Sequence, residues 1–152
     1  MYASLLTVHS WLRWVVILAG IVAFVRAVAG ASGRQPWKAS DDRAGFWFIL
    51  SLDVQLLIGL VLYFFLSDLT TSALRDFGGA MKISAWRFWA VEHPFGIFVA
   101  IALAHVGRAR ARKADSFRRH RVAAIFFGLA LAAILASLPW PGTPNARPLF
   151  RW

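Results

Sequence analysis

The sequence predicts an all-α fold: a four-helix transmembrane bundle with up-down-up-down topology and a short amphipathic helix on its outer surface. Three observations support this prediction. Of 152 residues, 59% are hydrophobic and 16% are charged, and the mean hydropathy is +0.60, a composition that suits lipid better than water. Four apolar stretches reach or approach the roughly 20 residues that a helix needs to cross a bilayer. The connections between them are short, which favours antiparallel neighbours.

The four apolar stretches cover residues 5–25, 44–66, 86–107 and 122–138, and we expect them to form one integral membrane domain over residues 1–152. The first stretch is expected to stay in the mature protein, because it contains Arg13 and lacks both a basic leading region and a small-residue cleavage site. Pro94 lies inside the third stretch, where it frees the carbonyl of Ala90 and predicts a kink beside His93.

The distribution of basic residues predicts the orientation. Eleven Lys and Arg residues lie in the connections 26–43 and 108–121, whereas five lie around the second connection and in the tail. By the positive-inside rule, both termini are extracytoplasmic. The net charge of +10 falls between apolar runs rather than along a polar face, so we expect contact with anionic membrane lipids and none with nucleic acid.

Two segments outside the spans have recognisable patterns. The tail from Pro139 contains four prolines, which predict an extended segment on the outer face rather than a fifth helix. In the second connection, apolar residues at helical spacing predict an amphipathic helix that ends at two glycines. These residues are Leu69, Ala73, Leu74 and Phe77, followed by Gly78 and Gly79.

Two histidines lie at matching depth in the first and third spans. His9 is 17 residues from Arg26 and His93 is 15 residues from Arg108, roughly 25 and 22 Å along their helices. Level imidazoles on two helices of a bundle suit the two axial positions of a b-type haem. The alternative is that both histidines only form hydrogen bonds between helices.

Nearby side chains suit a porphyrin. Arg13 and Arg87 are candidates to neutralise its propionates. We expect three aromatic residues to pack on the macrocycle and two small residues to leave room for it: Phe88, Phe95 and Phe98, with Ala90 and Gly96.

His105 and His120 form a second candidate pair, which would hold a second haem at the cytoplasmic end. His105 lies 12 residues after His93, about 120° around the helix, and His120 lies in a charged run. We therefore favour one haem b, with His105 and His120 as solvated interfacial residues.

The acidic residues have two interpretations. Arg13 and Asp53 differ in depth by about 5 Å, which favours a structural ion pair between them. Alternatively, Asp53 or Glu92 is a base that takes protons from a quinol.

The sequence contains no cysteine, which excludes disulfides, thiolate metal sites and iron–sulfur clusters. Met1 and Met81 are the only methionines, which disfavours a copper-handling protein. No nucleotide-binding or hydrolase motif occurs.

The segments HSWLRW (9–14) and RFWAVEHP (87–94) resemble those of small bacterial four-helix membrane cytochrome b-like proteins, and the likeness extends to the layout of the whole chain. The resemblance implies His9 and His93 as haem ligands, electron transfer, and the bacterial inner membrane as location. The chain differs from di-haem four-helix b-type cytochromes in lacking a second same-face histidine.

Two functions therefore fit the sequence. The first is a b-type cytochrome that transfers electrons between a quinol and an extracytoplasmic acceptor or respiratory complex, with its own quinol oxidation left open. The second is a non-catalytic membrane subunit or assembly factor without haem.

Overall fold

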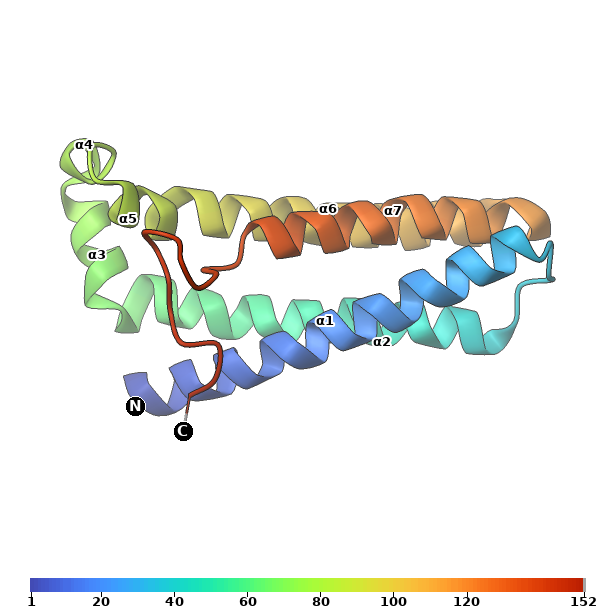
Figure 1. Ribbon diagram of the computed structural model, residues 1–152, viewed down its shortest axis with the longest axis horizontal. Helices are drawn as coiled ribbons and strands as arrows, with labels where there is room; N and C mark the ends of the chain where they lie inside the picture. The colour runs from blue at the N-terminus through green and yellow to red at the C-terminus, as the bar shows by residue number, and fades with distance from the viewer. Residues whose placement is uncertain (152) are drawn as a thin grey trace.

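The structure, a computed structural model, describes residues 1–151 apart from the side chain of Phe117. The predicted all-α fold is confirmed: the described residues form helices and contain no β-strand (Figure 1). The long helices are α1 (Tyr2–Ser32), α2 (Ala39–Val61), α6 (His93–Lys113) and α7 (Ser116–Ala136). Short helices are α3 (Asp68–Arg75), α4 (Phe77–Ala80) and α5 (Ser84–Arg87), and two π-helical turns are η1 (Leu62–Leu66) and η2 (Phe88–Glu92).

Within the described residues, four helical segments are long and apolar enough to cross a membrane, which fits a multi-pass membrane protein. They are Tyr2–Ser32, Ala39–Leu66, Ser84–Lys113 and Arg118–Ala136. The helices extend further into the first and third connections than predicted, leaving only 33–38 and 114–115 between them. Arginine and alanine are strong helix formers, so the basic connections continue the helices instead of ending them.

The long helices lie side by side, and successive ones run in opposite directions along the bundle (Figure 1). We call the end that carries α3, α4, α5 and the tail (137–151) the tail end, and the end with residues 33–38 and 114–115 the basic end. Helix α1 packs along α2 and α7, and α7 packs along α6. Helices α1 and α6 are therefore diagonal to each other, and α2 and α6 touch more sparsely.

Small residues bring α6 into close contact with α7. They recur every three or four residues on the face of α6 that meets α7, as is common where membrane helices approach closely. A Cβ added at Gly107 would overlap the Cβ of Phe126, and one at Gly96 would overlap Oγ of Ser137. The small residues are Gly96, Ala100, Ala104, Gly107 and Ala111.

A small residue also allows close packing of α1, around a core of aromatic side chains. A Cβ at Gly20 would lie 2.7 Å from Leu131 and 2.8 Å from Phe48. Behind it, the rings of Phe48 on α2 and Phe127 on α7 meet edge to face at 5.7 Å, a favourable aromatic geometry. Glycine at position 20 therefore allows α1 to approach α2 and α7 closely.

The amphipathic helix in the second connection is shorter than predicted. Helix α3 ends at Arg75, and Gly78 and Gly79 lie within the separate helix α4. The break occurs at Asp76, which leaves helical geometry (φ −121°, ψ 70°). Its carboxylate accepts a hydrogen bond from Gly79 N at 3.0 Å, so Asp76 caps a new helix instead of continuing the first.

The tail contains no helix up to residue 151, as predicted, but it folds back across the bundle to α1 (Figure 1). Nε1 of Trp11 donates to the carbonyl of Arg151 at 2.8 Å, and Nε1 of Trp14 donates to that of Leu149 at 3.1 Å. The ring of Phe150 stacks on Trp14 at 5.3 Å. These contacts attach the tail to α1.

Replacement of Gly107 by alanine tests the contact between α6 and α7. We expect Gly107→Ala to lower the free energy of unfolding by about 1–3 kcal/mol, because the added methyl group overlaps the side chain of Phe126. Thermal unfolding in detergent measures the change. Gly78→Ala is the matched control, since its Cβ would meet open space; equal effects of the two substitutions would contradict the packing described.

Candidate functional site: a cavity with two histidines

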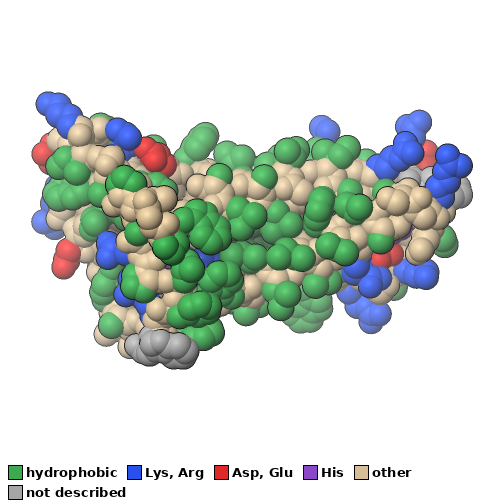
Figure 2. Space-filling model, in the orientation of Figure 1, with side chains coloured by type: hydrophobic (Ala, Val, Ile, Leu, Met, Phe, Trp, Pro, Cys, Tyr) green, Lys and Arg blue, Asp and Glu red, His purple; other side chains and the backbone are tan. Residues whose placement is uncertain are grey.

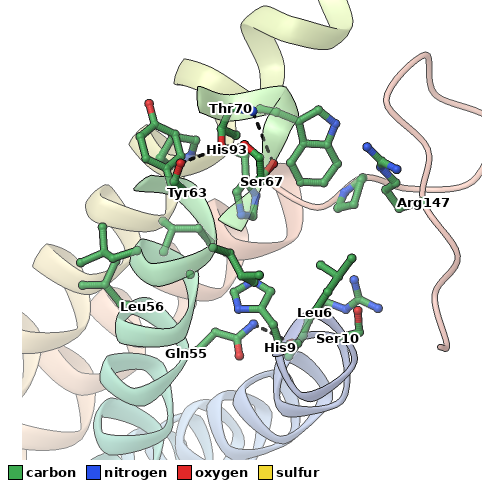
Figure 3. Close-up of a pocket in the computed structure, with 18 of the residues that line it drawn as sticks. Leu6, His9, Ser10, Gln55, Leu56, Tyr63, Ser67, Thr70, His93 and Arg147 are labelled. Atoms are coloured by element: carbon green, nitrogen blue, oxygen red, sulfur yellow. Dashed lines mark hydrogen bonds between the residues drawn. The ribbon is translucent and has the colours of Figure 1, made fainter. Parts of the chain in front are cut away.

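A cavity of about 470 Å³ lies at the tail end of the bundle, within the size range of small-molecule sites. Its walls come from α1, α2, η1, η2, α6 and the tail, and most of its lining is apolar. His9 from α1 and His93 from α6 both line it (Figure 3). The structure therefore brings the two predicted ligands to one cavity from diagonal helices.

The imidazole of His9 lies against α2. Its Cε1 would be 3.2 Å from a Cβ at Gly59, so glycine at that position gives the ring its space. The backbone carbonyl of His9 accepts a hydrogen bond from Nε2 of Gln55 at 2.9 Å. Its Nδ1 is buried and has no hydrogen-bond partner among the described residues. An unpartnered buried nitrogen is destabilising, and such atoms recur at binding sites.

The imidazole of His93 is held in one orientation. Its Nδ1 lies 2.8 Å from the carbonyl oxygen of Ser137, at the end of α7. Because a carbonyl can only accept, Nδ1 carries the proton, and the neutral ring keeps its free lone pair on Nε2. Metal-binding histidines are commonly fixed in this way, by a hydrogen bond from the second ring nitrogen to a carbonyl.

The helix before Pro94 is irregular: the π-helical turn η2 ends directly before His93. The carbonyl of Ala90, four residues before the proline, accepts a hydrogen bond from the Tyr63 hydroxyl at 2.7 Å. Tyr63 lies in η1, and its backbone carbonyl accepts a hydrogen bond from Oγ1 of Thr70 at 2.7 Å (Figure 3). A side chain of η1 thus satisfies a carbonyl of η2, and a side chain of α3 satisfies a carbonyl of η1. Both bonds lie beside the cavity, and π-helical turns are often found at functional sites.

The structure separates the two arginines that the sequence proposed for propionates. Arg13 lines the cavity and donates from Nη2 to the Leu149 carbonyl. Arg87 lies outside the cavity lining and pairs with Glu92 at 2.7 Å, so the structure does not bring it to this cavity. Two tail residues, Arg147 and Arg151, line the cavity instead.

Of the five residues expected to contact the porphyrin, three line the cavity and two do not. Phe95, Phe98 and Ala90 line the cavity. Phe88 is buried outside the lining, with its ring 6.0 Å from that of His93. Gly96 gives room to Ser137 on α7 rather than to the cavity. A residue that was not predicted, Trp89, lines the cavity with its ring 5.4 Å from His93.

The predicted ion pair between Arg13 and Asp53 is wrong. Oδ1 of Asp53 lies 3.0 Å from Nε2 of His105, while Arg13 is bound by the tail. Asp53 thus contacts a residue of α6 rather than one of α1. Glu92 is half-exposed and paired with Arg87. Both acidic residues that were candidates for a proton-accepting base, Asp53 and Glu92, are therefore paired with other side chains.

The second candidate pair of histidines lies in two different environments. His105 is half-exposed and lines a smaller cavity of about 360 Å³ between α2 and α6. His120 is 2% exposed, with its ring 4.8 Å from that of Trp37 and in contact with the position of Gly30. The expectation that His120 is solvated is therefore wrong, because one face of the basic helix turn around it is packed against α1.

The described residues contain no group of three or more His, Cys, Asp or Glu side chains that could hold a metal ion. A metal centre built from side chains alone is therefore not supported. Two imidazoles would be enough only for a metal whose other ligands belong to its own cofactor, as in haem.

Sequence reasoning missed Tyr63 and the two tail arginines. The signal for Tyr63 is Pro94, which frees the carbonyl of Ala90 and so requires a polar partner for it. Tyr63 is a polar residue near the end of the second span, at the same side of the membrane as Ala90. No local pattern predicts that Arg147 and Arg151 reach the cavity, because their position depends on the fold of the tail.

Comparisons with protein-family models, curated proteins and solved structures gave no match. The function is therefore inferred from the residues of this chain.

Removal of the Tyr63 hydroxyl tests the link between η1 and η2. We expect Tyr63→Phe to lower the free energy of unfolding by about 1–3 kcal/mol, since the Ala90 carbonyl would lose its partner. Tyr2→Phe is the control, because Tyr2 lies at the exposed start of α1. Thermal unfolding in detergent compares the two variants; a Tyr63→Phe protein as stable as the native one would contradict the role assigned to this bond.

Proposed function

We propose that the protein is a membrane b-type cytochrome that holds one haem b between His9 and His93. In this role it transfers electrons between a quinol and an extracytoplasmic acceptor or a larger respiratory complex. The observation that supports the proposal is that two imidazoles from diagonal helices line one apolar cavity, and one of them is oriented by the Ser137 carbonyl. The bound haem would supply one-electron redox chemistry.

The residues present fit such a group. His93 offers Nε2 to iron because its Nδ1 is engaged, and His9 has a buried nitrogen that lacks a partner. Phe95, Phe98 and Trp89 supply apolar and aromatic lining. The histidines would hold the iron and the aromatic side chains would exclude water, while the Ser137 carbonyl keeps one proton on Nδ1 of His93.

The proposed location is the bacterial inner membrane, with the tail end outside the cytoplasm. Eleven basic residues in the first and third connections support this orientation, and the resemblance to bacterial cytochrome b-like proteins supports the membrane. The cavity lies at the tail end, so electron exchange is proposed to occur on the extracytoplasmic side.

A second candidate function, a haem-free membrane subunit, is favoured by the groove between α2 and α6. Asp53 and His105 form an ion-pairing contact there although both are more than one-third exposed. Ionisable groups within membrane helices usually face a bundle interior or another partner. A helix of a larger complex covering this groove would explain their exposure.

The visible spectrum of histidine variants tests the leading proposal. We expect protein purified from haem-replete cells to contain one haem with sharp low-spin α and β bands after dithionite reduction. His9→Ala and His93→Ala should each abolish the low-spin bands, because one axial ligand is lost.

His105→Ala is the control, since this residue lies in the other cavity, and its spectrum should match that of the native protein. A colourless native protein would exclude the cytochrome and favour the haem-free subunit. Loss of haem from the His105 variant alone would mean that the site lies at the basic end.

A further inference from the structure

Three arginines line the cavity, and among the described residues none of them has a carboxylate partner. Arg13 comes from α1, and Arg147 and Arg151 come from the tail. Among the described residues, no Asp or Glu lies within ion-pair distance of any of the three. No acidic side chain of the described part of the chain therefore balances the positive charge at the cavity.

Three helical arginines outside the cavity lining are paired with carboxylates. Arg26 pairs with Asp41 at 2.7 Å, and Arg87 pairs with Glu92 at the same distance. Arg108 pairs with Asp42 at 2.9 Å. With seven acidic residues against 17 basic ones, carboxylates are scarce, and the structure places none of them at the apolar cavity that the three arginines line.

Arg13 indicates that this charge faces a ligand. Its Nη2 donates to the Leu149 carbonyl, but its Nε is buried without a partner among the described residues. A carbonyl satisfies one donor and leaves the charge of the guanidinium uncompensated. The guanidinium also lies over the ring of Trp14, 5.4 Å from its centroid, but neither contact supplies a negative charge. Arg13 is partly buried, where a charged group without a counterion is costly, and an Arg fork is suited to a carboxylate.

The fold of the tail places Arg147 and Arg151 at the cavity. The Trp11 and Trp14 indoles donate to backbone carbonyls of Arg151 and Leu149, which attaches the tail to α1. Arg147 lies over the Trp89 ring, 5.4 Å from its centroid, at the opposite wall (Figure 3). The tail thus crosses the cavity from α7 to α1, and its arginines lie along this crossing.

We propose that the cavity binds a ligand with an apolar body and carboxylate groups, and that Arg13, Arg147 and Arg151 bind those carboxylates. The inference rests on the proposed function in so far as haem b, with two propionates, has this chemistry. A fatty acid shares it. The apolar lining contacts the body of the ligand, and the tail binds its charged end.

The surface in Figure 2 agrees with this arrangement: hydrophobic side chains cover the middle of the bundle, and basic side chains gather towards its ends. A ligand that places its carboxylates at the tail end and its body between the helices would match both parts of that distribution. It would also compensate the charge on Arg13.

Binding of three probes to the full-length protein in detergent tests the proposal: haem b, haem b dimethyl ester and oleate. The ester keeps the apolar body and iron of haem but lacks the carboxylates. The variant is the double substitution Arg147→Gln, Arg151→Gln, which keeps the backbone carbonyls that hold the tail. The control is Arg75→Gln, Lys82→Gln, two basic residues at the same end that lie outside the cavity lining.

We expect the tail variant to bind haem b about tenfold more weakly than the native protein, as expected for lost charge-assisted hydrogen bonds. Binding of the dimethyl ester should be the same for both proteins, and the control variant should change haem binding by less than about twofold. Two results would overturn the carboxylate site: equal affinity of the native protein for haem b and its dimethyl ester, or unchanged haem affinity in the tail variant. Neither result would contradict haem binding by the two histidines.

Oleate separates the two sources of carboxylate. Arginine-dependent binding of oleate without any binding of haem would support the carboxylate site and exclude the cytochrome. Binding of none of the three probes would overturn both proposals.

Discussion

The hydrogen bond between Nδ1 of His93 and the carbonyl of Ser137 is the interaction on which the site depends. It joins the start of α6 to the end of α7, and it is possible because Gly96 leaves space for Ser137. The same bond fixes the ring of His93 and leaves the free lone pair of the imidazole on Nε2. Because the tail begins at Ser137, the position of the ring is also tied to the segment that crosses the cavity.

A membrane demands that backbone polar groups be satisfied inside the protein, and this demand explains the irregular features around the cavity. Pro94 removes a helical donor, and Tyr63 supplies a replacement to the Ala90 carbonyl. At the tail, the Leu149 carbonyl accepts from both Arg13 and Trp14. Each of these departures from regular helix is compensated by a side chain from another element, which holds the cavity walls in fixed positions.

The sequence predicted features that follow from length, hydropathy and depth: the four apolar helices, the non-helical tail, and one cavity shared by His9 and His93. Prediction failed where the outcome depended on which way a side chain turns around its helix. Asp53 was matched to Arg13 by depth but faces His105, and His120, expected in solvent, is buried against α1. The tail arginines were missed because no periodicity describes a segment whose position is set by tertiary contacts.

His9 and His93 are proposed to act together as axial ligands of one iron, and every other part of the proposed function follows from that pairing. Electron paramagnetic resonance of the oxidised native protein, purified from haem-replete cells, tests this pairing directly. We expect a low-spin ferric signal from two imidazole ligands, with one iron per chain. A high-spin signal would show that one histidine is not a ligand, and iron-free protein would contradict the cytochrome altogether.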